Sequence, residues 1–169
     1  DVTEDDAEAV RWYQEAAERG NLCAQHNLGV MYADGEGVTE DDVEAVRWYR
    51  KAAEQGYADA QNNLGVMYEN GEGVTEDDAE AVRWYRKAAE QGYASAQYNL
   101  GNMYADGEGV TEDDVEAVRW YRKAAEQGDV DAQSALGWMY GEGEGVTEDD
   151  AEAVRWYRKA AEQGVSDAQ

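Results

Sequence analysis

Residue types on which many functions depend are scarce or missing in this chain of 169 residues. Cys23 is the only cysteine, so no disulfide can form within the chain. His26 is the only histidine, so any histidine-based catalytic group would have to include it. No apolar run approaches the ~20 residues that a membrane-spanning helix requires. Proline is absent, and no segment shows the alternating pattern of a β-strand.

Basic residues are also scarce, and their shortage limits the classes of partner. The chain has 14 Lys and Arg against 39 Asp and Glu, a formal net charge of −25. Nucleic acids and anionic membrane surfaces require basic side chains, so we expect neither as a partner. A protein or peptide, in particular a basic one, fits the charge, which also serves to keep the chain soluble. The unpaired thiol of Cys23 favours a reducing compartment such as the cytoplasm. The sequence does not decide whether a targeting segment precedes it.

One segment of 36 residues recurs along the whole sequence. Residues 39–74 and 75–110 match at 30 of 36 positions. A fixed period of this size predicts one elongated array over residues 1–169, in which each unit buries its apolar face against its neighbours. The blocks of the array are 3–38, 39–74, 75–110, 111–146 and a partial block, 147–169.

Each block predicts a pair of antiparallel helices. In the second block, apolar residues at helical spacing predict a helix over 41–55, with Thr39 or Asp41 as its N-cap and Gly56 as its stop. A second, shorter helix is predicted over 58–69. Nine helices are expected in all, and residues 167–169 should begin a further short helix.

Two invariant features of the blocks predict how the helices pack. Gly65 interrupts the shorter helix and recurs in every block, which indicates that a large side chain of the partner helix needs room there. The Trp-Tyr dipeptides lie on the apolar stripe of the longer helix, so we interpret them as core residues and not as stacking platforms for bases. They begin at residues 12, 48, 84, 120 and 156.

The repeated motif resembles a known family. Leu28-Gly29-x-x-Tyr32 and the helix that follows it resemble the tetratricopeptide core pattern. The longer period, and Gln25 in place of an early Trp, are similar instead to the Sel-one-like repeat family. Its pattern Ala-x-x-x-Leu-Gly-x-Met-Tyr begins at Ala24 and recurs through essentially the whole chain. With the period, this resemblance implies an all-α, right-handed superhelical solenoid of antiparallel helix pairs.

Catalytic, cofactor and metal sites are not indicated by the sequence. Cys23 and His26 could form a dyad, but ordinary drift within one repeat explains them better. The acidic loops lack the ligand spacing of a calcium loop, and helix capping with solvation accounts for them. The Gly-x-Gly of each loop follows a helix and not a strand, so it is not a nucleotide-binding motif. We expect no enzyme activity and no cofactor.

The copies differ mainly along one face of the shorter helix. The variable positions are 22, 26, 30 and 33 of the first block and their equivalents, which are spaced to lie on one helical face. In tetratricopeptide-like arrays this helix lines a concave surface that binds peptides, so the resemblance implies a groove here. Drift of an exposed face is the alternative. The candidate groove residues are His26, Val30, Asn62, Val66, Glu69, Tyr98, Asn102, Ser134 and Trp138, with Asn63 and Asn99 beside them.

The sequence therefore predicts a non-enzymatic scaffold, or adaptor, that binds a protein or peptide in the groove of the repeat array. Two alternatives stay open. The chain could be a structural module whose copies associate head to tail, or an engineered consensus repeat protein. The partner of an adaptor is not indicated by the residues.

Overall fold

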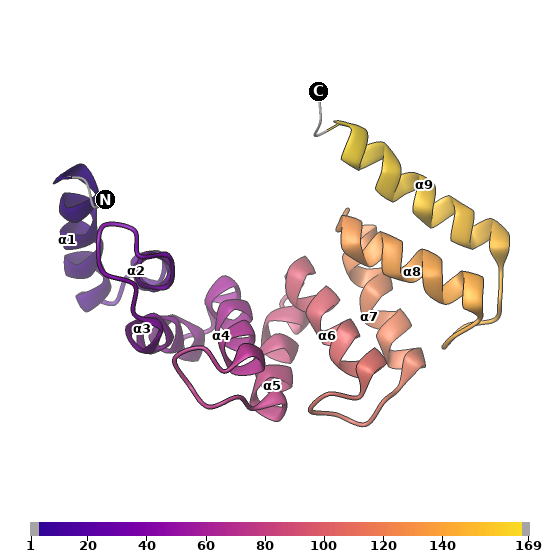
Figure 1. Ribbon diagram of the computed structural model, residues 1–169, viewed down its shortest axis with the longest axis horizontal. Helices are drawn as coiled ribbons and strands as arrows, with labels where there is room; N and C mark the ends of the chain where they lie inside the picture. The colour runs from indigo at the N-terminus through magenta and orange to yellow at the C-terminus, as the bar shows by residue number, and fades with distance from the viewer. Residues whose placement is uncertain (1–3, 167–169) are drawn as a thin grey trace. The chain divides into compact units, whose positions relative to one another are not determined.

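The computed structural model describes residues 4–166, and within that range it contains nine α-helices and no strand (Figure 1). Consecutive helices are joined by short loops and pack against each other in pairs. The all-α fold of stacked helix pairs is thus confirmed. The expected start of a further helix at 167–169 lies outside the described residues. The helices are α1 (Glu4–Glu18), α2 (Leu22–Asp34), α3 (Asp42–Glu54), α4 (Ala58–Asn70), α5 (Asp78–Glu90), α6 (Ala94–Asp106), α7 (Asp114–Glu126), α8 (Val130–Glu142) and α9 (Asp150–Ser166).

The chain forms two compact units, Asp1–Ala88 and Ala89–Gln169. In unit 1, α2 packs against α1 and α3, and α3 packs against α4. In unit 2, α7 packs against α6 and α8, and α8 packs against α9. The same pairing of helices therefore builds both units, as the sequence repeat predicts.

The ends of the helices follow from local sequence. Asp41 is the N-cap of α3 and accepts a hydrogen bond from the backbone N–H of Glu44 at 3.1 Å, so it and not Thr39 fills that role. The α4 helix ends at Gly71, which adopts a left-handed conformation at φ 71°. Because α4 continues to this glycine, it has 13 residues, as many as α3. The prediction that the second helix of the pair is the shorter one was therefore wrong.

Each core is formed by the apolar stripe of the first helix of a pair, by the second helix of that pair, and by the tryptophan of the next repeat. In unit 1, Trp84 of α5 packs against a cluster that includes Tyr49 of α3 and Leu64 of α4. In unit 2, Trp156 of α9 packs in the same way against α7 and α8. Trp84 is only 4% exposed, as expected for a core residue.

Glutamine side chains, most of them buried, tie the helices together in both units. The side-chain amide of Gln61 donates to the backbone carbonyl of Ala53 at 2.9 Å, which joins the end of α3 to α4. Gln127 donates to the side chain of Gln97 at 2.7 Å and so links α7 to α6. Every hydrogen bond of this kind satisfies a polar group that would otherwise be costly to bury.

The interpretation of every Trp-Tyr dipeptide as core was wrong at the two ends of the chain. Trp12 is 65% exposed, and Tyr13 and Tyr157 are also exposed. In the inner repeats a neighbouring helix pair covers the equivalent side chains, and no such pair covers these within residues 4–166. Apolar side chains are therefore accessible at both end faces.

None of the helices in the described range is long and apolar enough to cross a membrane.

Candidate functional site

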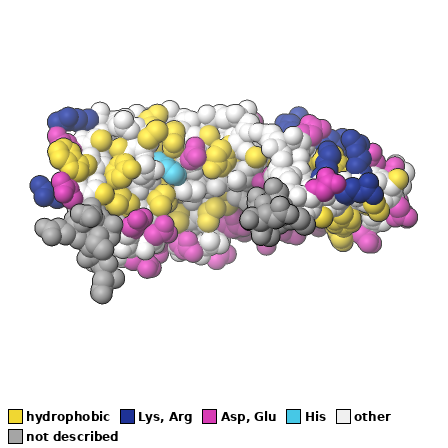
Figure 2. Space-filling view, turned by 90° about the horizontal axis from the view of Figure 1, so that it is seen from above, with side chains coloured by type: hydrophobic (Ala, Val, Ile, Leu, Met, Phe, Trp, Pro, Cys, Tyr) yellow, Lys and Arg dark blue, Asp and Glu magenta, His cyan; other side chains and the backbone are white. Residues whose placement is uncertain are grey.

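The candidate face lies on α2 and α4 of unit 1 and on α6 and α8 of unit 2. Most of its variable side chains are partly exposed, in contrast to the buried Leu-Gly-x-Met positions beside them. Hydrophobic side chains predominate around the histidine in Figure 2, an acidic side chain lies close to it, and no Lys or Arg side chain lies next to it. The face is thus more apolar than the strongly acidic composition of the chain suggests.

A close contact between an invariant glycine and an invariant tyrosine shapes this face. A Cβ atom placed on Gly65 of α4 would lie 2.6 Å from the ring of Tyr85. In unit 2, a Cβ atom on Gly101 of α6 would lie equally close to the ring of Tyr121. Only glycine fits at such positions, which confirms that the recurring glycine makes room for a large side chain. That side chain comes from the first helix of the following block, α5 or α7, and not from the helix paired with it in its own block.

The tyrosine that crosses each glycine carries its hydroxyl group to the variable residues. In unit 1, the Tyr85 hydroxyl donates a hydrogen bond to the carboxylate of Glu69. In unit 2, the Tyr121 hydroxyl donates to the side-chain oxygen of Asn102 at 2.8 Å. In these two repeats the same donor from the core thus orients two different acceptors.

The environment keeps these tyrosines protonated. Burial raises the pKa of Tyr49 to about 12, an effect that a hydrogen bond with Asn63 partly opposes. The pKa of Tyr85 is also raised, first by burial and then by the hydrogen bond to Glu69 and its charge. Burial is likewise the main cause of the raised pKa of Tyr121. The hydroxyl groups therefore act as donors over the physiological pH range.

His26 is the centre of a polar cluster in unit 1. Its Nδ1 lies 3.2 Å from the side-chain oxygen of Asn27, and its Nε2 lies 3.2 Å from the side-chain nitrogen of Asn63. An oxygen acceptor at Nδ1 and an amide donor at Nε2 fit the neutral imidazole protonated at Nδ1. The ring also packs near Tyr49 and Tyr57, with centroids 5.8 and 5.5 Å away. This cluster joins α2 to α4 across the candidate face.

Glu69 is the only acidic residue at the variable positions of the four repeats. It is partly buried at the C-terminal end of α4, where Tyr85 fixes its carboxylate. No Lys or Arg forms an ion pair with it within residues 4–166. A positively charged group of a partner would find an oriented carboxylate here.

Unit 2 presents the aromatic part of the face. Trp138 of α8 is 47% exposed, which makes it the most accessible large side chain at a variable position. Tyr98 of α6 is half-buried, and its ring lies 5.9 Å from that of Tyr121. Because Tyr98 also packs against the core of unit 2, it has a structural role beside any role in binding.

The remaining candidates differ in how well they are placed to bind. Val30 and Val66 are partly exposed, and Val30 also packs against the core of unit 1. Asn62 is buried, and its amide contacts Asn63. The hydroxyl of Ser134 donates to the Val130 carbonyl of its own helix at 3.0 Å. Asn99 is partly exposed.

Two features bear on the catalytic and metal alternatives. Cys23 is exposed, and its Sγ lies 3.6 Å from the hydroxyl oxygen of Tyr57, whereas His26 contacts the two asparagines described above. Within the described range, no group of three or more His, Cys, Asp and Glu side chains is arranged to hold a metal ion.

Sequence reasoning missed the tyrosine hydroxyls as part of this face. It placed the Trp-Tyr dipeptides in the core on the basis of helical spacing, which reports where a ring lies but not where its hydroxyl points. A signal was available, since the chain contains 12 tyrosines and no phenylalanine. A purely apolar role would not require the hydroxyl group.

The fold and the repeated Gly-Tyr contact define this protein as an all-α repeat protein of the solenoid class. The family model for the Sel1 repeat matches residues 1–21, 24–57, 58–93, 94–129 and 130–165. The chain belongs to the Sel1 repeat family. No match was found among curated protein sequences.

Several solved structures resemble this chain. A protective antigen present in uropathogenic Escherichia coli strains, which displays an SLR fold, is 50% identical over 92% of this chain with a TM-score of 0.89. A Sel1 repeat protein from Oxalobacter formigenes is 42% identical over 92% with a TM-score of 0.88. Helicobacter pylori cysteine rich protein B is 25% identical over 80%, and the match covers 98% of that protein. Its TM-score is 0.64. The chain spans 33% of the E. coli protein and 64% of the Oxalobacter protein.

Proposed function

We propose that this chain is a non-enzymatic scaffold that binds a protein or peptide through the variable faces of its second helices, α2 and α4 in unit 1 and α6 and α8 in unit 2. Sel1 repeat proteins generally mediate protein interactions and are generally non-catalytic. The observation that carries the proposal is Trp138, a large aromatic side chain left 47% exposed at a position that is Val, Val and Asn in the three preceding repeats. Exposed aromatic residues of this kind often supply most of the binding energy of an interface.

The oriented carboxylate of Glu69 supports a preference for a partner with a basic side chain. The carboxylate is fixed by Tyr85 and partly removed from water, so a Lys or Arg of the partner would gain a charge-assisted hydrogen bond there. The net charge of −25 would also attract a basic partner over longer distances. Glu69→Gln should therefore weaken the binding of a basic peptide.

A direct test is to select peptides on the purified chain from a random display library and to titrate the best ones by fluorescence anisotropy. Trp138→Ala should weaken binding at least tenfold. Trp12→Ala is the matched control, because it removes an equally large exposed side chain from another surface. Equal binding by the wild-type chain and Trp138→Ala would contradict the proposal.

Head-to-tail self-association is the second candidate, and the exposed end faces favour it. Trp12 and Tyr13 on α1, and Val154 and Tyr157 on α9, are equivalent to side chains that are buried between inner pairs. Sedimentation velocity over a wide concentration range tests it. Oligomers that disappear in Trp12→Ala and persist in Trp138→Ala would support this candidate against the groove.

A further inference from the structure

The positive charges of this acidic chain are gathered at one repeated place. Twelve of the 14 basic residues occur in four copies of the segment Arg-Trp-Tyr-Arg-Lys. The segment lies on the first helix of each pair, so these charges are on α3, α5, α7 and α9 and not on the helices of the candidate groove. This surface is therefore richer in positive charge than the rest of the chain.

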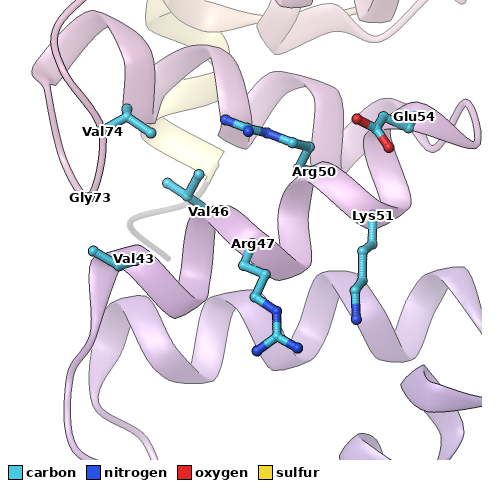
Figure 3. A pocket seen from close by; sticks show the side chains of 8 residues that line it. All are labelled: Val43, Val46, Arg47, Arg50, Lys51, Glu54, Gly73 and Val74. Carbon is cyan, nitrogen blue, oxygen red and sulfur yellow. The ribbon is translucent and has the colours of Figure 1, made fainter.

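A pocket with an apolar and a charged end lies on this surface in unit 1 (Figure 3). Val43 and Val46 of α3 and Val74 of the following loop form its apolar end. The loop comes this close because residue 73 is glycine, where a Cβ atom would lie 2.2 Å from the carbonyl oxygen of Asp42. The pocket has a volume of about 400 Å³, and Val43 is 64% exposed at its edge.

The charged end carries three cations and one carboxylate, and contacts within the protein hold the cations in place. The Arg50 guanidinium donates to the hydroxyl of Tyr68 at 2.7 Å and extends toward the valines in Figure 3. On the opposite side, the ammonium of Lys51 lies 3.8 Å from the centre of the Trp48 ring. Arg47 completes the set but is already paired with Glu44 at 2.9 Å, and Glu54 is the carboxylate.

Unit 2 repeats the arrangement with the same residue types. Val115, Val118 and Val146 line a pocket of about 330 Å³ together with Arg119, Arg122, Lys123 and Glu126. Arg122 donates to the hydroxyl of Tyr140 at 2.6 Å, as Arg50 does to Tyr68. Val115 is 64% exposed, the same fraction as Val43. In the repeat between the two pockets, the exposed position is Ala79.

We propose that each of these two pockets is a further binding site, which takes acidic peptide segments that carry an aliphatic side chain. The side chain would enter between the valines, where it removes exposed apolar surface from water. Carboxylates next to it would meet Arg50 and Lys51 in one pocket and Arg122 and Lys123 in the other, two cations against the single glutamate of each lining. The second arginine of each pocket is already paired with a glutamate of its own helix. These pockets would repel a basic peptide, which is the kind of peptide that we expect the candidate groove to prefer.

The test uses a fluorescein-labelled peptide in which two leucines are flanked on each side by two glutamates. Its anisotropy is followed during titration with the whole chain in 0.15 M NaCl, where charges more than ~8 Å away are screened. Val43→Gln together with Val115→Gln should weaken binding at least tenfold without adding charge. Ala79→Gln is the matched control and should bind within about twofold of the wild type. Circular dichroism verifies that the variants are folded.

Other variants and peptides separate the two ends of the pocket. Replacing leucine by serine, or glutamate by glutamine, in the peptide should each abolish measurable binding. Arg50→Met with Arg122→Met should weaken binding of the acidic peptide, while Trp138→Ala should leave it unchanged. The proposal is overturned if the wild type shows no saturable binding up to 1 mM peptide (about −4 kcal/mol), if the double valine variant binds as the wild type does, or if Ala79→Gln loses binding equally.

Discussion

Gly65→Ala is the substitution for which two general expectations disagree in sign. In an isolated helix the change would stabilise α4 by about 1 kcal/mol, because alanine restricts the unfolded backbone. In the folded chain, the new methyl group would lie 2.6 Å from Cε1 and 2.7 Å from Cδ1 of Tyr85. The ring of Tyr85 is fully buried, so it has little room to move. Overpacking of this kind costs about 1–3 kcal/mol.

The cost of the clash should exceed the gain in helix propensity. We expect Gly65→Ala to lower the free energy of unfolding by up to about 2 kcal/mol, equivalent to a decrease of up to roughly 8 °C in the melting temperature. Thermal and urea unfolding followed by circular dichroism at 222 nm measure the change. Because repeat proteins can unfold in stages, wild type and variant should be compared at the same urea concentration.

Gly137→Ala provides a control within the same chain. Its methyl group would lie 3.0 Å from the ring of Tyr157, and that ring is 43% exposed and can move aside. The propensity gain should then be equal to or larger than the cost, and stability should be unchanged or higher by up to about 1 kcal/mol. If Gly65→Ala stabilises the protein as much as Gly137→Ala does, the glycine is not required by the tyrosine contact and the account of the face is wrong.

Three further predictions concern stability. Trp84→Ala should destabilise the chain by about 3–5 kcal/mol in urea unfolding, while Trp12→Ala should cost less than about 1 kcal/mol; similar losses would show that the end and inner repeats are packed alike. Adding NaCl should raise the melting temperature, because it screens the mutual repulsion of the acidic side chains in a chain of net charge −25. It also weakens exposed ion pairs such as Arg47–Glu44, but each of these is worth at most about 1 kcal/mol. A lower melting temperature would show that the ion pairs contribute more than the repulsion. Burial raises the pKa of Tyr49 to about 12, so the unfolded chain ionises first, and the free energy of unfolding should fall between pH 10 and 12; Tyr49→Phe should reduce that fall.

The repeat made most of the fold predictable. The helix over 41–55 was found at Asp42–Glu54, and the contact behind Gly65 follows from its recurrence in every block. Both depend on local spacing and on one large side chain, which a repeated sequence displays many times. The helix predicted over 58–69 extends one residue further, because Asn70 continues it to the left-handed Gly71 without an apolar residue to mark it.

The candidate site could be predicted only in part. Spacing placed the variable positions on one helical face, but it could not show that Asn62 is buried while Trp138 is accessible. That difference depends on which neighbouring helix covers each side chain. The partner of the Tyr85 hydroxyl could not be predicted either, since Glu69 is 16 residues away on another helix. The pockets beside Val43 and Val115 likewise depend on how the following loop packs.

The central claim is that the partner lies on the variable face of the second helix of each pair. Site-specific photo-crosslinking tests it most directly, with benzoylphenylalanine introduced at position 138 on that face and at position 12 on the end face of α1. Both residues are exposed tryptophans in the wild type, so the probe is tolerated equally at each. The account predicts that a selected peptide forms an adduct at position 138 and not at position 12. Adducts at position 12 alone would contradict it and place the interaction at the end of the array.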